Sequence, residues 1–184
     1  MKEIRLHGRG GQGTVSAADL IAVASVIDGK YGTSLPMYGA ERRGAPVVSF
    51  VCIHDQPVRQ KTQIYTPSCL IVLDSRQRNL PQIYEGIKPG GFLVLNFNKS
   101  LENRPHPNIT VAGVVDATKI AIEEIGIPAF NTCMLGAFAA ATGWVKLESI
   151  LLALEKNFSG ELLKKNMKTV KRGYQEVMIK RWQG

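Results

Sequence analysis

Cysteine is scarce in this sequence of 184 residues, and its three cysteines, Cys52, Cys69 and Cys133, are far apart and form no CxxC pair. An iron–sulfur cluster needs about four thiolates in tight local groups, and a structural zinc site needs similar pairs. The spacing therefore excludes both kinds of metal centre in this chain alone. We expect the three cysteines to be small buried apolar residues in a reducing compartment.

Long apolar runs are also lacking. The longest, at residues 137–141, is far too short to span a bilayer, and the chain does not open with a basic and apolar leader. Hydrophobic residues make up 45% of the sequence and charged residues 21%, which is ordinary for a globular protein. We expect one cytoplasmic domain over residues 1–184, with no membrane partner and a core that buries roughly 70% of the unfolded surface.

Acidic residues are in the minority, so the formal net charge is +8 and the sequence pI is about 9.5. The surplus lies in a basic segment between Lys164 and Arg181 and in arginines scattered near turns. A nucleic-acid-binding protein concentrates such charge on one face, so we predict no nucleic-acid partner. We interpret the basic segment first as the solvated side of a helix, second as a docking surface for an acidic partner and only third as a DNA-binding surface.

Hydrophobic patterning predicts an α/β fold with three α/β/α layers, a Rossmann-like, mainly parallel or mixed sheet, and a helical C-terminal part. The expected strands are residues 3–8, 31–35, 46–54, 69–73, 92–96 and 109–112. The expected helices are residues 14–28, 80–87, 116–125, 131–142, 147–156 and 160–181. The second strand would complete a β-α-β unit with a right-handed crossover, and residues 58–60 would extend a hairpin after the third.

The most informative segment is Gly8-Arg9-Gly10-Gly11-Gln12-Gly13, called the glycine turn below, which follows a short strand and leads into an apolar helix. Glycines let the backbone adopt positive φ angles and approach an anion closely. The first N–H groups of a helix have no intrahelical partner and lie at the positive end of its dipole. This order of elements is typical of a phosphate cradle. The candidate binding residues here are Gly8, Gly10, Gly11, Gln12, Gly13 and Thr14.

A missing acid narrows the choice of nucleotide. Rossmann NAD sites carry Asp or Glu about 20 residues after the glycines, at the end of the next strand. Here that position reads Gly32-Thr33-Ser34-Leu35-Pro36. This argues against NAD and leaves a nucleotide with another ribose decoration, such as coenzyme A. The alternative is a tight turn that only packs the helix on the sheet.

A second loop, Glu41-Arg42-Arg43-Gly44, lies between Pro36 and Pro46. Loops after strand ends line the ligand crevice of an open α/β sheet. We therefore predict that Arg42 or Arg43 lies beside the glycine turn, where a guanidinium can clamp a phosphate or carboxylate. The alternative is that these charges face solvent.

No residue is assigned a catalytic or metal-binding role. His7, His54 and His106 are isolated, with no carboxylate or cysteine at ligand spacing. Asp74 ends a buried strand and is predicted to cap the next helix rather than to act as a base. Asn131 either caps a helix or faces the ligand crevice.

Further segments accompany the two loops in the same order: Asp116-Ala117-Thr118, Asn131-Thr132-Cys133-Met134-Leu135-Gly136-Ala137, Asn166 and Lys171-Arg172-Gly173-Tyr174. With them, the whole chain resembles the gamma subunit of pyruvate:ferredoxin oxidoreductase (pyruvate synthase) and related 2-oxoacid:ferredoxin oxidoreductases. The segment ERRGAP is more similar to the pyruvate and branched-chain (2-ketoisovalerate) versions than to the 2-oxoglutarate version.

The resemblance implies a subunit, inactive alone, of an enzyme that converts a 2-oxoacid and coenzyme A into acyl-CoA, carbon dioxide and reduced ferredoxin. In that family thiamine diphosphate, Mg²⁺ and iron–sulfur clusters do the chemistry. This chain has no GDG segment with a downstream Asn and too few cysteines, so these groups are expected on companion alpha, beta and delta subunits. Its implied role is structural, with coenzyme A bound by the glycine turn and Arg42 or Arg43. Ferredoxin would be met through the complex, and the isolated chain is a candidate homodimer.

Two other functions stay open at this point. A stand-alone nucleotide-binding or sensor module would use the same glycine turn without a catalytic partner. In a purely structural alternative, the glycine turn and the arginine loop contact only other subunits.

Overall fold

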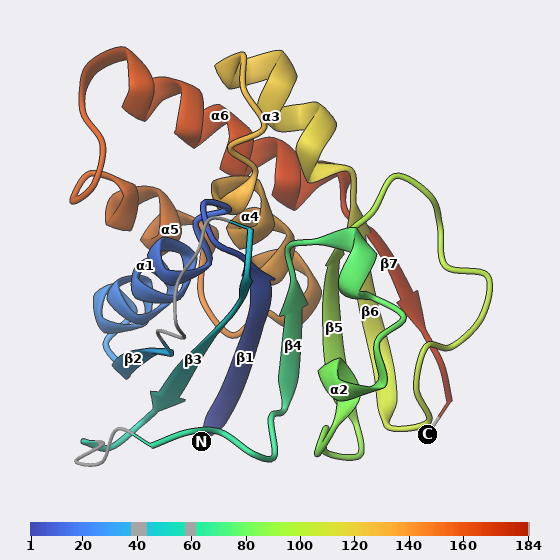
Figure 1. The fold of residues 1–184 in the computed structure, drawn as a ribbon. Coiled ribbons are helices and arrows are strands. Elements are labelled where there is room, and N and C mark those ends of the chain that lie inside the picture. Colours follow the sequence, from blue (N-terminus) through green and yellow to red (C-terminus); the bar gives the residue numbers. More distant parts are fainter. Residues whose placement is uncertain (38–43, 58–61, 184) are drawn as a thin grey trace.

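The computed structural model describes residues 1–37, 44–57 and 62–183, and its centre is one mixed sheet of 7 strands (Figure 1). The strands are β1 (Lys2–Arg9), β2 (Tyr31–Met37), β3 (Pro46–His54), β4 (Cys69–Val72), β5 (Gly91–Asn96), β6 (Ile109–Val115) and β7 (Met178–Arg181). They lie in the order β2-β3-β1-β4-β5-β6-β7. Strands β1, β4, β5 and β6 are parallel neighbours, whereas β3 and β7 run antiparallel to the strands beside them.

One face of the sheet is covered by helices α1, α3, α4, α5 and α6 (Figure 1). Their bounds are α1 (Thr14–Ile27), α3 (Ala117–Ile125), α4 (Asn131–Thr142), α5 (Leu147–Leu154) and α6 (Gly160–Glu176). Leu6 of β1 and Ile71 of β4 pack with Met134 and Phe138 of α4 in the main core, each at most 1% exposed. Burial of this continuous apolar surface is the main source of the fold's stability.

The opposite face has a much thinner cover. It carries the short 3₁₀ helix η1 (Ser75–Gln77), helix α2 (Pro81–Tyr84) and connecting chain. Ile83 and Tyr84 of α2 belong to a second, smaller core cluster with Leu70 of β4 and Leu93 of β5. The predicted α/β class and mixed sheet are confirmed, and the two outer layers are very unequal.

Strand β2 lies at the sheet edge and does not pair with β1. Strand β3 lies between them and is antiparallel to both. Helix α1 packs directly on β2. The contact is so close at Gly32 that a Cβ there would overlap the carbonyl oxygen of Ala22. The expected β-α-β unit is therefore present with a third strand inserted into it.

Helix α2 is much shorter than the expected helix 80–87. The guanidinium of Arg5 donates hydrogen bonds to the carbonyl oxygens of Ile83 and Glu85 at 2.8 and 2.7 Å. Gly86 then turns the chain with a φ angle of 73°. These carbonyl groups thus accept hydrogen bonds from a side chain of β1 instead of from the amides of a further helical turn.

The C-terminal helix is also shorter than expected. Helix α6 ends at Glu176, and residues 178–181, predicted as its last turn, form β7 on the edge of β6. Residues 58–60, expected to extend a hairpin, lie outside the described residues. Within the described ranges, no helix combines the length and apolar character needed to cross a membrane.

Candidate anion-binding site

The glycine turn connects β1 to α1 at the carboxyl end of the parallel strands (Figure 1). Gly11 has a φ angle of 90° and Gly13 one of 74°, a conformation that other residues rarely adopt. Gly13 directly precedes Thr14, the first residue of α1. The turn therefore brings the positive end of the α1 dipole to the sheet edge where open α/β folds bind ligands.

Among the amides of the turn from Gly10 onward, two are already bonded within the protein. The Gly10 amide donates to the carbonyl oxygen of Ala45 at 2.9 Å, and the Gln12 amide donates to that of Arg9 at 3.0 Å. The Gln12 side chain also folds back, since its Oε1 accepts a hydrogen bond from the Arg9 amide at 2.8 Å. Whether Gly10 and Gln12 contribute amides to an anion site therefore stays a prediction, and in this structure both amides have partners within the protein.

The other amides are available. Those of Gly11, Gly13, Thr14, Val15 and Ser16 have no acceptor among the described residues. Such groups at the start of a helix are satisfied by water or by an anion. This part of the glycine turn keeps its predicted ability to hold a phosphate.

Gly8 belongs to the contact between helix and strand rather than to the cradle. A Cβ at Gly8 would overlap Oγ1 of Thr14, and the Gly8 carbonyl oxygen accepts a hydrogen bond from Nε2 of Gln77 at 3.1 Å. Thr14 is 2% exposed, and its hydroxyl has no partner among the described residues. The binding role predicted for these two residues stays a prediction.

Asn131 faces the glycine turn. It is the first residue of α4, whose N-terminus is not capped by a side chain, and a Cβ at Gly13 would lie 2.6 Å from Asn131 Nδ2. Of the two roles left open by the sequence, the structure therefore favours the crevice over the cap. It also shows a second reason why position 13 requires glycine.

Arg9 and Arg76 enclose the carboxylate of Asp74 beside the glycine turn. Arg9 Nε donates to Oδ2 at 2.5 Å, while Arg76 donates from Nε to Oδ1 at 2.9 Å and from Nη2 to Oδ2 at 3.0 Å. The Arg76 amide donates to Oδ1 at 3.1 Å, which confirms the predicted helix cap. Sequence reasoning found Asp74 but missed both arginines; the only signal was an arginine inside the glycine turn and another two residues after Asp74.

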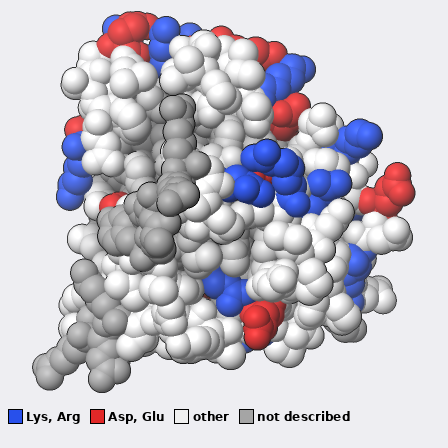
Figure 2. Space-filling model, in the orientation of Figure 1, with Lys and Arg blue, Asp and Glu red and all other residues white. Residues whose placement is uncertain are grey.

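One further basic group, Arg78, lies close to this arginine pair, since its Nη1 donates to the carbonyl oxygen of Ser75 at 2.8 Å. Arg9 also donates from Nη1 to the carbonyl oxygen of Gly44 at 3.1 Å. The Arg78 guanidinium lies over the ring of Phe97, 4.4 Å from its centroid. Figure 2 shows basic side chains gathered on this side of the molecule over the region where β4 ends. The surroundings of the glycine turn are therefore positively charged and favour a phosphate.

Asp74 positions the arginines rather than acting as a base. Burial alone would raise the pKa of its carboxyl group, but hydrogen bonds from Arg76 and Arg9 outweigh burial and hold the pKa below its ordinary value. The carboxylate is therefore ionised at neutral pH. Charge-assisted bonds of this kind fix the planar guanidinium groups in orientation.

Arg42 and Arg43 lie outside the described residues, so their place beside the glycine turn stays a prediction. The chain that follows them does reach the turn. The Gly44 amide donates to the carbonyl oxygen of Gly10 at 3.3 Å, next to the Gly10–Ala45 bond.

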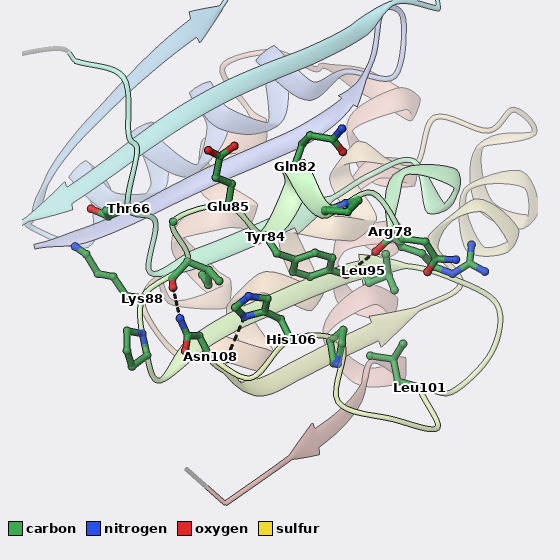
Figure 3. Close-up of a pocket in the computed structure, with 16 residues that line it drawn as sticks. Thr66, Arg78, Gln82, Tyr84, Glu85, Lys88, Leu95, Leu101, His106 and Asn108 are labelled. Carbon is green, nitrogen blue, oxygen red and sulfur yellow. Dashed lines mark hydrogen bonds between the residues drawn. The ribbon is translucent and has the colours of Figure 1, made fainter.

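Two cavities flank α2 on the thinly covered face. In the larger, of about 1020 Å³, the rings of Tyr84 and His106 are stacked with centroids 5.7 Å apart (Figure 3). The smaller, of about 630 Å³, has Arg5 and His7 among its lining residues.

His7 is not suited to acid–base catalysis. Its Nε2 accepts a hydrogen bond from Arg5 Nε at 3.0 Å. Burial, and secondarily the charge of Arg5, lower its pKa to about 3, so the ring is neutral at physiological pH. Within the described ranges, no group of three or more His, Cys, Asp and Glu side chains is arranged to hold a metal ion.

Comparison with known proteins assigns the family. The family model described as pyruvate ferredoxin/flavodoxin oxidoreductase matches residues 3–176. The chain belongs to this family. The match confirms the resemblance to this family that the sequence motifs of the chain indicated.

Individual members of the pyruvate ferredoxin/flavodoxin oxidoreductase family match almost the full chain. It is 44% identical over 182 residues to the pyruvate/ketoisovalerate oxidoreductases common subunit gamma of Thermococcus litoralis, covering 97% of this chain and 98% of that one. It is 46% identical to the NADH-dependent phenylglyoxylate dehydrogenase subunit gamma of Aromatoleum evansii, covering 97% and 95%. The crystal structure of pyruvate oxidoreductase subunit PORC from Thermotoga maritima has a TM-score of 0.84 at 38% identity, with 97% of each chain covered.

Proposed function

We propose that this chain is the gamma subunit of a pyruvate-type 2-oxoacid:ferredoxin oxidoreductase and that it helps to bind coenzyme A. The observation that carries the assignment is the 44% identity to a gamma subunit over 97% of this chain and 98% of that one. The enzyme would convert a 2-oxoacid and coenzyme A into acyl-CoA, carbon dioxide and reduced ferredoxin. The chain would be inactive without its companions.

The redox groups would be held by other subunits. Three widely spaced cysteines cannot ligate an iron–sulfur cluster. We therefore place thiamine diphosphate, Mg²⁺ and the clusters on companion alpha, beta and delta subunits, with ferredoxin meeting the assembled complex.

The coenzyme A contribution rests on the geometry of the glycine turn. The amides of Gly11, Gly13 and Thr14 would donate hydrogen bonds to the pyrophosphate, because helix N-termini favour phosphate. Arg9 and Arg76, fixed by Asp74, supply the positive charge nearby. A guanidinium with unused N–H groups can bind a phosphate in bidentate fashion.

The test uses the complex assembled from this chain and its companion subunits. Pyruvate- and coenzyme A-dependent reduction of ferredoxin should appear only when this chain is present. In that complex we expect Arg76→Met to raise the KM for coenzyme A about tenfold with little change in kcat, as loss of ground-state binding predicts. Arg76 is suitable because its side chain is 69% exposed.

The matched control is Lys168→Met, which removes an exposed cation from α6 and should leave the KM for coenzyme A unchanged. If Arg76→Met behaves like this control, the coenzyme A assignment is wrong while the subunit assignment stands. Full activity without this chain would reject both.

A second candidate is the gamma subunit of a branched-chain, 2-ketoisovalerate-type enzyme. The Thermococcus litoralis relative is named as common to pyruvate and ketoisovalerate oxidoreductases, and the Aromatoleum evansii relative is named for phenylglyoxylate. We infer that companion subunits select the 2-oxoacid. The ratio of kcat/KM for pyruvate and 2-ketoisovalerate in the native complex distinguishes the two candidates.

A stand-alone sensor module makes a different prediction. It would bind NAD or ATP tightly as an isolated chain, which calorimetric titration measures. For a gamma subunit we expect no tight binding of either nucleotide.

A further inference from the structure

The cavity of about 630 Å³ on the thinly covered face is lined by side chains from several parts of the chain. Its floor comes from β1 and β3, and its walls come from residues 63–65 and from the chain that enters α2. The lining side chains that matter here are Arg5, His7, Phe50, Ile64, Leu80 and Ile83. A mainly apolar lining with a few polar groups is typical of a binding pocket.

Arg5 in this cavity is a buried cation whose hydrogen-bond partners among the described residues are all neutral. Its guanidinium is held by the carbonyl oxygens of Ile83 and Glu85 and by the imidazole of His7, and the residue is 8% exposed. No carboxylate in the described part of the chain forms a salt bridge with it, and the charge of Glu85 acts on it only at longer range. A buried charge is costly unless it is paired. The cavity therefore favours a carboxylate from outside.

Large apolar side chains surround the opening. Met37, Tyr65 and Leu80 are 37%, 74% and 45% exposed, and all of them line the cavity. Gln63 joins the first two, since Tyr65 Oη donates to its Oε1 at 2.7 Å and its Nε2 lies 3.2 Å from the Met37 sulfur. Exposed apolar groups around one opening mark a protein contact, and tyrosine is enriched among residues that dominate binding energy.

We propose that this pocket docks a companion subunit of the oxidoreductase, which inserts a carboxylate side chain flanked by apolar side chains. The proposal rests on the proposed function. The carboxylate would pair with Arg5, and the apolar neighbours would pack on Met37, Tyr65 and Leu80.

A protein chain fits the site better than a free small acid for two reasons. The rim side chains are exposed as well as lining the cavity, with Tyr65 74% exposed, so a small ligand inside would leave most of Tyr65 in water. In residues 1–37, 44–57 and 62–183 the sheet also has no full second layer on this face, whereas the parallel strands of α/β proteins are normally covered on both faces. A docked subunit would supply that cover, and an acidic one complements the net charge of +8.

The experiment measures assembly of this chain with the companion subunits. We expect Tyr65→Ala to weaken assembly about tenfold or more, with the isolated variant as stable as wild type because the side chain is mostly exposed. The matched control is Ile127→Ala, since Ile127 is 59% exposed and does not line the cavity. Hydrogen exchange of the wild-type chain should slow on assembly at residues 62–66 and 80–84.

The buried charge is tested with Arg5→Gln, after its fold has been checked by circular dichroism. We expect weaker assembly, with partial recovery in Arg5→Lys. The Tyr65 variant keeps the test valid if the Arg5 variants do not fold.

The outcomes separate the two proposals. If the wild-type chain does not assemble, the proposed function fails. If it assembles but Tyr65→Ala assembles equally well and exchange is unchanged at both segments, only the docking pocket fails. Binding of 4-methylpentanoate, a small apolar carboxylate, to the cavity of the assembled complex would also overturn the docking pocket, because the cavity would then be empty of protein.

Discussion

Gly136 of α4 and Gly173 of α6 each face the backbone of the other helix. A Cβ at Gly136 would overlap the carbonyl oxygen of Val170, and a Cβ at Gly173 would overlap that of Cys133. The two helices therefore touch backbone to backbone, and neither position has room for a side chain.

We expect Gly173→Ala to lower the free energy of unfolding by about 2 kcal/mol, because the helices must separate to admit the methyl group. This loss outweighs the helix propensity that alanine gains, about 1 kcal/mol. Urea denaturation followed by circular dichroism measures it. Gln175→Ala, an exposed change on the same helix, should stay within about 0.5 kcal/mol of wild type; equal effects of both variants would contradict the close contact.

The buried carboxylate of Asp74 should make stability depend on pH. Its pKa is lowered in the folded protein, so its contribution is complete above the unfolded pKa and is lost as the pH falls through the folded value. Asp74→Asn should therefore destabilise the protein at pH 7 by about 1–3 kcal/mol and show a shallower loss of stability in acid. Thermal unfolding between pH 7 and pH 3 measures both effects. Asp55→Asn, at an exposed position, serves as the control and should follow the wild-type profile.

Asp28 connects the end of α1 to the start of α5. Its Oδ2 accepts a hydrogen bond from the Lys146 amide at 2.8 Å, and its Oδ1 accepts one from the Ser149 hydroxyl. Asp28→Ala should cost about 1 kcal/mol, as for the loss of a helix cap. Asp28→Asn keeps one acceptor oxygen and should lose less in the same chemical denaturation experiment; a larger loss for Asn than for Ala would be inconsistent with capping.

The cysteines should differ in reactivity. Burial raises the pKa of all three thiols, that of Cys133 to about 12, but Cys52 is only partly buried and therefore accessible to a reagent. Since the thiolate is the reactive form, iodoacetamide at pH 8 should modify Cys52 first, as measured by mass spectrometry of the native protein. In urea all three should react at similar rates, and early labelling of Cys69 without urea would mean that this region opens.

Sequence patterns predicted most elements because each depends on local information. The apolar run at Cys69–Val72 and the span of α4 were predicted from their composition and periodicity alone. Strand order could not be predicted in this way. Alternation of apolar residues marks a strand but not its neighbour, so the insertion of β3 between β1 and β2 was not visible. Residues 178–181 were assigned to a helix because their pairing partner is the distant strand β6.

In the candidate site, too, local features were predicted from the sequence and long-range contacts were not. The glycine turn was recognised because its residues are contiguous and precede a helix. The bond between Arg9 and Asp74 joins residues 65 positions apart, and no spacing rule predicts it. The buried Arg5 and its cavity also depend on tertiary contacts, since their partners lie in the chain around α2.

Strand β1 precedes the other strands of the sheet in the sequence but lies inside the sheet, between β3 and β4. Its hydrogen-bonding partners are β3 and β4, which end at His54 and Val72. One edge of β1 therefore stays unpaired until β3 has been synthesised and the other until β4 has been synthesised, and non-local pairing of this kind is slow. A fragment that stops before Pro46 would display the glycine motif without the strands that hold it in shape.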